Sequence, residues 1–460
     1  MGNKKNAWLK FDDTKKEEIF SFCEGYKKYI SDCKTERESI KEAISLAESK
    51  GYRDLKNVIS AGKSLKAGDK VYYNNMDKSL ALFLIGSESI ESGMRIIGSH
   101  VDSPRLDLKP NPLYEDSELS LMETHYYGGV KKYQWVTIPL ALHGVVVKKD
   151  GTKIDVVVGE EETDPVVMVS DLLVHLASEQ QQKKATEVIA GEDLNILVGS
   201  MPLEGEEKEA VKANILKLLK EKYDFEEEDF MSAEIEIVPA GKARDLGLDR
   251  SMVAGYGHDD RICAYTSLLA LLETESVKKT SVVLLVDKEE VGSIGATGMQ
   301  SRFFENAVAE LMDRVGEYSE LKLRRALANS KMLSSDVTAA FDPNYAGAYE
   351  KKNSAFFGKG LAFAKYTGAR GKSGCNDANA EFVAWLRNVM DENDVAYQMA
   401  ELGKVDQGGG GTIAYILAEY GMEVIDCGVA LQNMHAPWEV ASKVDIFETM
   451  RGYKAFLMAE

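Results

Sequence analysis

The sequence predicts an α/β protein with a second, partly β domain inserted into the first. At 460 residues, the chain is too long for one hydrophobic core of ordinary size. From residue 255 onward, short apolar runs alternate with helical stretches, as in α/β proteins. Between about residues 107 and 238, Val-rich runs and glycine turns replace this pattern. The predicted domains are therefore residues 1–106 and 241–460 for the larger one, and residues 107–240 for the insertion.

The elements of the first half follow from local patterns. Lys, Glu and Ile recur at helical spacing from Lys15 to about Ser49, which predicts an amphipathic helix. The apolar runs 81–85 and 94–98 each end at Gly or Ser and predict core strands. Within the insertion, a turn at 149–151 separates two Val-rich runs, and a charged helical stretch covers 204–228.

The second half repeats strand and helix in turn. Helices are predicted at 264–272, 303–315, 378–390 and 412–420. Strands are predicted at 281–286, 331–333 and 423–427. The glycine run 408–411 before the last helix either lets the backbone approach a substrate or serves only as a flexible turn.

Composition excludes several classes of protein. The chain has 56 basic and 75 acidic residues, and its net charge of −19 opposes binding to nucleic acid or to an anionic membrane. Five cysteines occur without a Cys-x-x-Cys pair, so neither a disulfide framework nor a thiolate zinc site is expected. The N-terminal residues lack an apolar stretch for a signal sequence, and no apolar run is long enough to cross a bilayer. We therefore expect a cytoplasmic protein.

Metal-binding residue types follow predicted strands or glycine turns at five places, where open α/β sheets bind their ligands. The first is GSHVDSP from Gly98. In extended chain, His100 and Asp102 project from the same face, so Asp102 can hold one ring nitrogen of His100 and leave the other for a metal. Alone, a His-x-Asp pair is more often a satisfied buried histidine.

The next two places each offer a pair of carboxylates. In GHDDRI from Gly257, Asp259 or Asp260 can bridge two cations, because each carboxylate oxygen serves one metal, or can simply cap a helix. In DKEEVGS from Asp287, two glutamates follow a fully apolar strand. Adjacent side chains in extended chain point to opposite faces, so one can bind a metal while the other faces the attacking water.

The last two places each offer a single residue, Asp336 in LSSD and His435 in LQNMHAP. Each of these residues is weak evidence for a metal site by itself. Taken together, however, two histidines and several carboxylates without a ligating cysteine fit a hydrolytic pair of Zn, Co or Mn ions better than a structural zinc site.

These segments resemble the aspartyl aminopeptidase family of two-metal exopeptidases, of bacterial type. The matching motifs are GSHVDSPRLDLKP, HDDRICAYTSLLAL, DKEEVGS, SSDVTAAFDPNY and MHAPWEVAS. They stand in the order found in the family and span nearly the whole chain. The resemblance implies a three-layer αβα zinc-peptidase catalytic domain and an inserted, mainly β, oligomerisation domain.

The resemblance also implies two divalent metal ions per subunit, zinc in the first place and cobalt or manganese otherwise. Their ligands are the following side chains: His100 and Asp336 on one ion, Glu290 and His435 on the other, and Asp259 bridging both. The neighbouring Asp260 stays open as an alternative bridge.

Four further residues have roles that the resemblance implies. Glu289 corresponds to the general base, and Asp102 to the partner that orients His100. Lys365 is the nearest match to a lysine that binds the substrate. His175, in DLLVHL, corresponds to a histidine delivered into the active site of a neighbouring subunit within a closed homo-oligomer, a tetrahedral dodecamer. On an apolar helical stretch, the alternative is an ordinary packed histidine.

The predicted function is thus metal-dependent removal of N-terminal residues, acidic ones among them, from peptides. Two alternatives stay open: another metal-dependent amide hydrolase of the same superfamily, such as a deacetylase or carboxypeptidase, and a non-catalytic scaffold that kept the fold. The insertion and MHAPWEVAS oppose the first. Glu289 opposes the second, because a scaffold has no need of a carboxylate beside the metal ligands. Hydrolysis of aminoacyl amides with and without a chelator separates these functions.

Overall fold

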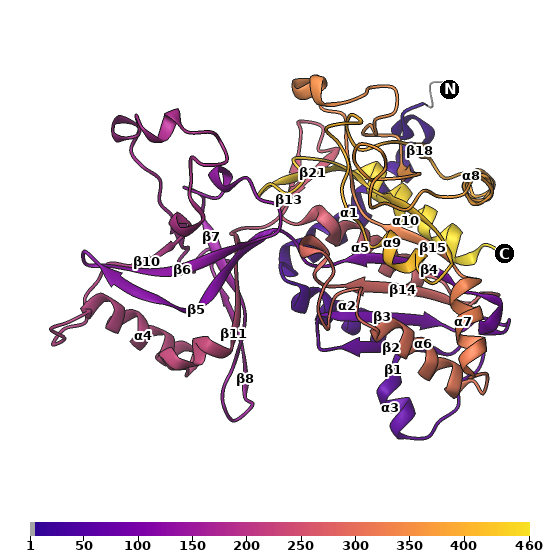
Figure 1. Cartoon of the computed structure of the whole chain (residues 1–460), viewed down its shortest axis with the longest axis horizontal. Helices are drawn as coiled ribbons and strands as arrows, with labels where there is room; N and C mark the ends of the chain where they lie inside the picture. Colours follow the sequence, from indigo (N-terminus) through magenta and orange to yellow (C-terminus); the bar gives the residue numbers. More distant parts are fainter. Residues whose placement is uncertain (1–4) are drawn as a thin grey trace. The chain divides into compact units, whose positions relative to one another are not determined.

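The computed structural model describes residues 5–460, which form two compact units (Figure 1). The first unit comprises the residues up to Asp102 together with Ala243–Met434 and Glu439–Glu460. The second comprises Ser103–Lys242 and His435–Trp438. The predicted domain boundaries lie at 106 and 240, close to these bounds, and the grouping of residues 435–438 with the insertion was not predicted.

The first unit is built on a nine-stranded sheet whose middle strands, β14, β4, β15 and β19, run parallel. These strands are almost entirely buried, which is why β14 is a nearly continuous apolar run and β4, β15 and β19 each contain adjacent apolar residues. In spatial order, the strands are β1 (Arg53–Asp54), β2 (Lys70–Asn75), β3 (Ser79–Leu84), β14 (Ser281–Val286), β4 (Arg95–His100), β15 (Lys331–Ser335), β19 (Glu423–Gly428), β17 (Leu361–Ala364) and β18 (Tyr397–Met399).

Helices cover both faces of this sheet. Alternate strand residues point to opposite faces, so Leu82 and Ile97 join one hydrophobic core while Phe83 and Ile96 join the other. The first core is completed by α2 (Glu36–Ser49), α5 (His258–Leu272), α8 (Ala380–Glu392) and α10 (Lys443–Met458). The second is completed by α3 (Leu55–Ser60), α6 (Phe303–Arg314), α7 (Glu320–Ala328) and α9 (Ala414–Ala418). The three-layer αβα arrangement is therefore confirmed.

The N-terminal helical stretch is two helices rather than one. Asp12 caps α1 (Asp13–Asp32) by accepting from the Lys15 N–H. Thr35 and Glu38 then form a capping box that starts α2. The inner face of α1 contributes Tyr26 to a third core, which also contains Ile262 of α5 and so lies beneath the segment that carries Asp259.

A small five-stranded sheet leads into the site. Its strands, in spatial order, are β12 (Arg244–Leu246), β13 (Met252–Gly255), β21 (Glu439–Ser442), β20 (Ala430–Gln432) and β16 (Thr338–Ala339). β13 runs directly into α5, and it pairs antiparallel with β21 so that Gly255 lies opposite Glu439. This pairing brings residues far apart in the chain to the start of α5.

The second unit contains a seven-stranded antiparallel sheet. Its spatial order is β8 (Lys153–Val158), β7 (Leu140–Val147), β11 (Ala233–Pro239), β5 (Arg105–Asp116), β6 (Leu119–Tyr127), β10 (Ile196–Gly199) and β9 (Met168–Val169). The charged stretch predicted at 204–228 forms α4 (Ala210–Tyr223), which packs on β10, where a Cβ at Gly199 would meet Ile215 at 2.6 Å. The strands dominate this unit, so it is mainly β.

Residues 5–460 include all five cysteines, and each is a free thiol. Within the same residues, no helix combines the length and apolar character needed to cross a lipid bilayer.

Candidate metal centre

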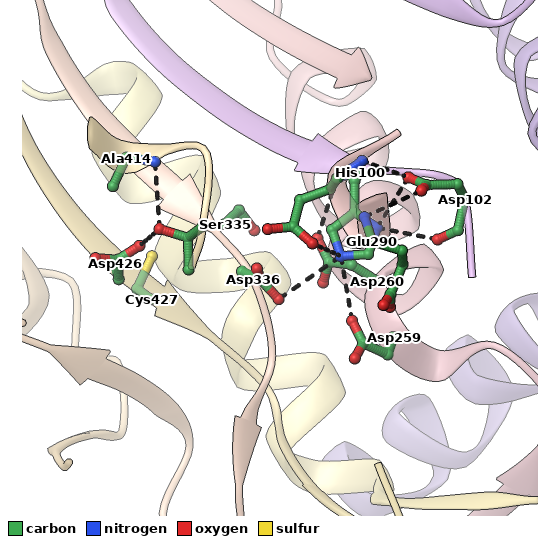
Figure 2. A network of polar contacts seen from close by, with 12 residues as sticks. His100, Asp102, Asp259, Asp260, Glu290, Ser335, Asp336, Ala414, Asp426 and Cys427 are labelled. Atoms are coloured by element: carbon green, nitrogen blue, oxygen red, sulfur yellow. Dashed lines mark hydrogen bonds and ion pairs between the residues drawn. The ribbon is translucent and has the colours of Figure 1, made fainter. Parts of the chain in front are cut away.

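Four of the five predicted metal ligands meet beside the carboxyl ends of the central strands. His100 is the last residue of β4, and Asp336 follows β15. Glu290 lies in the 3₁₀ helix η8 (Glu289–Val291) just after β14, and Asp259 lies in the first turn of α5. Parallel strands end on the same edge of a sheet, so these side chains converge. Figure 2 shows their carboxylates turned toward the His100 ring.

His100 belongs to two groups of possible metal ligands. The ligand atoms of His100, Asp259 and Glu290 lie within 4.8 Å of one another, and so do those of His100, Asp260 and Asp336. The His100 Nε2 lies 3.2 Å from Asp259 Oδ1 and 3.8 Å from Asp336 Oδ1. Two atoms bound to one zinc ion at about 2.1 Å each stand roughly 3–4 Å apart. The spacing therefore suits divalent cations.

The contacts of His100 turn its Nε2 toward the carboxylates of the cluster. Its Nδ1 lies 2.9 Å from the carbonyl oxygen of Asp102 and 3.3 Å from the carboxylate Oδ1. A carbonyl only accepts, so Nδ1 carries a proton, and in the neutral ring Nε2 carries the lone pair that a metal needs. Burial lowers the pKa of His100, but hydrogen bonds to Asp102 and Asp259 outweigh it and raise the pKa well above the ordinary value. These negative surroundings favour a cation at Nε2, whether a proton or a metal.

Asp102 also accepts hydrogen bonds from the backbone of Glu289 and Glu290. This contact was not predicted from the sequence. Its Oδ1 accepts from the Glu289 N–H and its Oδ2 from the Glu290 N–H, each at 3.2 Å. The glutamates stand in a 3₁₀ helix after Lys288, whose φ of 69° is left-handed, so the prediction of extended chain at this point was wrong. One buried carboxylate thus orients three residues of the site.

Asp259 and Asp260 both lie beyond the first residue of α5, so neither stands at the capping position before His258. The capping position belongs to Gly257, and no side chain accepts a cap hydrogen bond there. Both aspartates have non-helical backbone angles and are buried, and the peptide bond between them is cis. The backbone N–H of His100 donates a hydrogen bond to Asp260 Oδ2, with 3.3 Å between the nitrogen and the oxygen. Both carboxylates therefore face the cluster.

The cluster concentrates negative charge in a buried place. Burial raises the pKa of Asp260 well above its ordinary value, and the charge of Asp336 raises it further. Burial also raises the pKa of Asp336 well above the ordinary value, although the nearby His100 opposes this and Glu289 adds to it. Divalent cations are the counter-charge that histidine nitrogen and carboxylate oxygen bind. The residues present therefore fit a metal centre.

His435, the fifth predicted ligand, belongs to the second unit and to neither of the two ligand groups found among residues 5–460. Its Nδ1 lies 2.9 Å from the carbonyl oxygen of Gly129, to which it donates. A Cβ at position 129 would lie only 3.1 Å from that nitrogen, so glycine allows this close approach. As in His100, Nε2 then carries the lone pair that a metal needs.

Lys365 follows β17 and is already paired with a carboxylate. Its ammonium contacts one oxygen of Asp377, and the Lys372 Nζ lies 2.8 Å from the other. The two lysines lower the pKa of Asp377. Any substrate carboxylate would therefore compete with Asp377 for Lys365.

His175 is exposed, so the interpretation as a packed core histidine was wrong. It lies in the short 3₁₀ helix η4 (Val174–Leu176) rather than in a longer helical stretch. Its neighbours Leu173, Val174 and Leu176 are 59%, 61% and 68% exposed. Contiguous exposed apolar side chains are typical of an interaction surface.

Glu439 contacts the main chain of Asp259 and was not predicted from the sequence. Its Oε2 accepts from the Asp259 N–H at 3.1 Å, and its side chain is buried. The available signal was a glutamate that precedes Val440 and Ala441 in an apolar strand, four residues after a metal-ligand candidate. A charged residue in such a strand needs a buried partner.

Comparison with known proteins identifies the family. Residues 29–457 match the family described as aminopeptidase I zinc metalloprotease, M18. The chain is 66% identical over 454 residues to a probable M18 family aminopeptidase 1 of Clostridium acetobutylicum, with 98% of each chain covered. It is 46% identical to the Thermotoga maritima relative of the same name, covering 99% of this chain and 98% of that one.

The fold is also similar to solved structures of M18 aminopeptidases. The crystal structure of aminopeptidase I from C. acetobutylicum has a TM-score of 0.93 at 64% identity, and that of the M18 aminopeptidase from T. maritima has a TM-score of 0.95 at 45% identity. Each pair covers 99% of both chains. The more distant mApe1 dodecamer of S. cerevisiae, at 20% identity, shares the fold with a TM-score of 0.77 and covers 95% of this chain and 96% of that one. The chain therefore belongs to the M18 family of aminopeptidase I zinc metalloproteases and is a metal-dependent aminopeptidase.

Proposed function

We propose that the enzyme removes N-terminal residues from peptides with two divalent metal ions per subunit. Their ligands are His100 and Asp336 on one ion, Glu290 and His435 on the other, and Asp259 as the bridge. The observation that carries this proposal is that the buried His100 lies in one group of possible ligands with Asp259 and Glu290 and in a second with Asp260 and Asp336. The names of the relatives favour an aminopeptidase over a deacetylase, a carboxypeptidase or a scaffold.

Different side chains have different roles in the proposed reaction. When bound, a pair of divalent cations supplies an activated water and positive charge for the oxygen that becomes negative during attack. Glu289 stands outside both ligand groups of the described residues, with its Oε2 3.8 Å from His100 Nε2 and its side chain 14% exposed. It is placed to take the proton of the water and to return it to the leaving amine. Asp102 holds Glu289 in place through the backbone.

Removal of the metals is expected to abolish hydrolysis. Every proposed ligand is a nitrogen or oxygen donor, and no protein nucleophile is evident at the site among residues 5–460, so hydrolysis is expected to depend on the cations. Treatment with a chelator should reduce hydrolysis of aminoacyl chromogenic amides to background, and Zn, Co or Mn should restore it. Elemental analysis that finds fully active protein without metal would contradict the proposal.

The Asp102→Asn change is expected to weaken metal binding by roughly ten- to a hundredfold, the scale for residues that orient a ligand without touching the metal. Asparagine keeps the shape of the side chain, but its NH₂ group would face one of the two backbone N–H groups of Glu289 and Glu290. Titration of the metal-free protein with zinc measures the loss. An affinity equal to that of the wild type would reduce Asp102 to a packing residue.

We further propose that Lys365 recognises an acidic side chain at the substrate N-terminus. Lys365→Ala should then lower hydrolysis of aspartyl amides about tenfold more than that of leucyl amides, the scale of one lost hydrogen bond to a charged group. The matched variant Asp377→Asn should change the ratio in the opposite direction, because it releases both lysines that Asp377 now neutralises. If Lys365→Ala slows both substrates by the same factor, Lys365 does not set specificity.

The inserted unit is proposed to form a homo-oligomer, a tetrahedral dodecamer, in which His175 enters the active site of a neighbouring subunit. The exposed apolar residues beside His175 support a surface that a second copy covers. The S. cerevisiae neighbour of this fold is a dodecamer, which agrees with the proposal. The cytoplasmic location and the peptide substrates stay predictions.

A further inference from the structure

A buried glutamate contacts the main chain of the proposed bridging aspartate. Glu439 begins β21, opposite Gly255 of β13, and its Oε2 lies 3.1 Å from the Asp259 N–H. Glu439 and Asp259 are 1% and 3% exposed, so water does not compete for this hydrogen bond. The contact joins residues 180 positions apart in the chain.

The segment that carries Asp259 departs from helical geometry. Gly257 occupies the cap position in a left-handed conformation, with φ of 73°, and Asp259 and Asp260 both depart from helical angles. The first N–H groups of a helix have no partner within the helix and must find one elsewhere. Glu439 supplies that partner for Asp259, so it sets the direction in which the backbone presents the Asp259 carboxylate.

His258, the residue before Asp259, is fixed by a contact with helix α1. The His258 Nδ1 and the Tyr26 hydroxyl share a hydrogen bond of 2.5 Å, and the two rings stack with their centroids 5.6 Å apart. Both side chains are fully buried. With His258 fixed by α1 and Asp259 fixed by β21, the peptide between them is held at both ends.

The chemistry of Glu439 suits this task better than a neutral residue would. A carboxylate makes a shorter and roughly twofold stronger hydrogen bond to an N–H than a neutral acceptor does. Burying another carboxylate near the acidic cluster is costly unless cations bind close by. Replacing Glu439 by glutamine keeps an acceptor for the same N–H and removes only the charge.

We infer that Glu439 is a positioning residue that fixes the main chain of Asp259 and thereby aims its carboxylate between the two metal ions. This inference rests on the proposed role of Asp259 as the bridge. Glu439 touches neither substrate nor reacting atoms in this role. Its loss should therefore appear first in metal affinity and in the geometry of the bound ions.

The experiment is a cobalt titration of the metal-free, full-length protein, followed by the visible absorption bands of Co²⁺. The variants are Glu439→Gln, which keeps a neutral acceptor, and Glu439→Ala, which removes it. Asp445→Asn is the matched control, because Asp445 is also a buried carboxylate that accepts backbone N–H groups, from Gly358 and Gly360, away from the site. Asp259→Asn is the reference for loss of the bridge, and thermal unfolding of each variant reports its stability.

For Glu439→Ala we expect Co²⁺ to bind at least about tenfold more weakly and the absorption bands to change shape, as for other residues that orient a ligand. For Glu439→Gln we expect an intermediate loss of about threefold or more, because its neutral oxygen binds the Asp259 N–H less strongly. Asp445→Asn should lower the unfolding temperature while its Co²⁺ affinity and spectrum stay those of the wild type.

Two results would overturn the inference. One is Co²⁺ binding by Glu439→Gln that equals the wild type in affinity and spectrum. If Glu439→Ala does not fold, the result for Glu439→Gln alone tests the role of Glu439. The other is a loss in Glu439→Ala no larger than that in Asp445→Asn. If Asp259→Asn itself binds Co²⁺ like the wild type, the proposed metal centre fails. A defective Asp259→Asn beside a normal Glu439→Gln rejects only the role of Glu439.

Discussion

Glu289→Gln is expected to keep its metal and to lose turnover by at least about a hundredfold, the scale for removing a general base. Glutamine has the same shape and leaves the backbone N–H that Asp102 accepts. Its amide cannot take a proton from water at neutral pH. Because Glu289 lies outside both ligand groups of the described residues, the metals should remain bound. Single-turnover kinetics and elemental analysis on the same sample measure the two quantities.

The neighbouring variant Glu290→Gln is the matched control. Glu290 shares a ligand group with His100 and Asp259, so its loss should lower metal affinity and activity together, with activity returning at high metal concentration. The two glutamates are adjacent and equally conservative to replace, so only their roles differ. If Glu289→Gln loses metal in proportion to activity while Glu290→Gln keeps its metal, the two roles are exchanged.

Much of the first unit could be predicted because its strands are simple in composition. β14 is an unbroken apolar run, since both of its faces are covered by helices. Strands of this kind end abruptly at polar residues. The ligand candidates His100, Glu290 and Asp336 stand at or just beyond such ends, so locating the strands also located them.

Helix α10 shows why other elements escaped prediction. Nearly all of its sixteen residues are buried, so it has no polar face and no clear apolar stripe. Its polar residues are satisfied at long range. Lys443 pairs with Asp245, and Asp445 accepts the Gly358 and Gly360 N–H groups. The sequence of α10 alone does not predict these partners, because they lie far away in the chain.

The finer geometry of the site depends on contacts across the chain. Asp102 accepts N–H groups 187 and 188 residues away, and Glu439 accepts one 180 residues away. Lys288 adopts a left-handed conformation that its residue type does not favour. Tertiary contacts impose such features. The spacing rule for extended chain therefore predicted the wrong local conformation after β14, while the roles of the two glutamates stay predictions.

His175→Ala is expected to lower turnover by about a hundred- to a thousandfold, as loss of one hydrogen-bond donor to a tetrahedral intermediate does. His175 is exposed and lies among exposed apolar residues, so its own unit does not enclose it. Its proposed role requires a second copy of the chain to cover that surface. Metal content should therefore stay at the level of the wild type while activity falls.

Mixing of subunits tests whether the histidine acts across an interface. When His175→Ala and Glu289→Gln subunits are mixed in equal amounts and allowed to exchange, about a quarter of the sites should combine an intact metal centre with an intact donated histidine, because assembly of identical surfaces is random. Activity should therefore recover well above either parent. A mixture of Glu289→Gln and Glu290→Gln subunits is the control, since both changes damage the same centre and cannot complement each other. No recovery in the first mixture, with exchange shown by labelled subunits, would mean that His175 serves its own subunit or lies outside the reaction, because random assembly must otherwise create repaired sites.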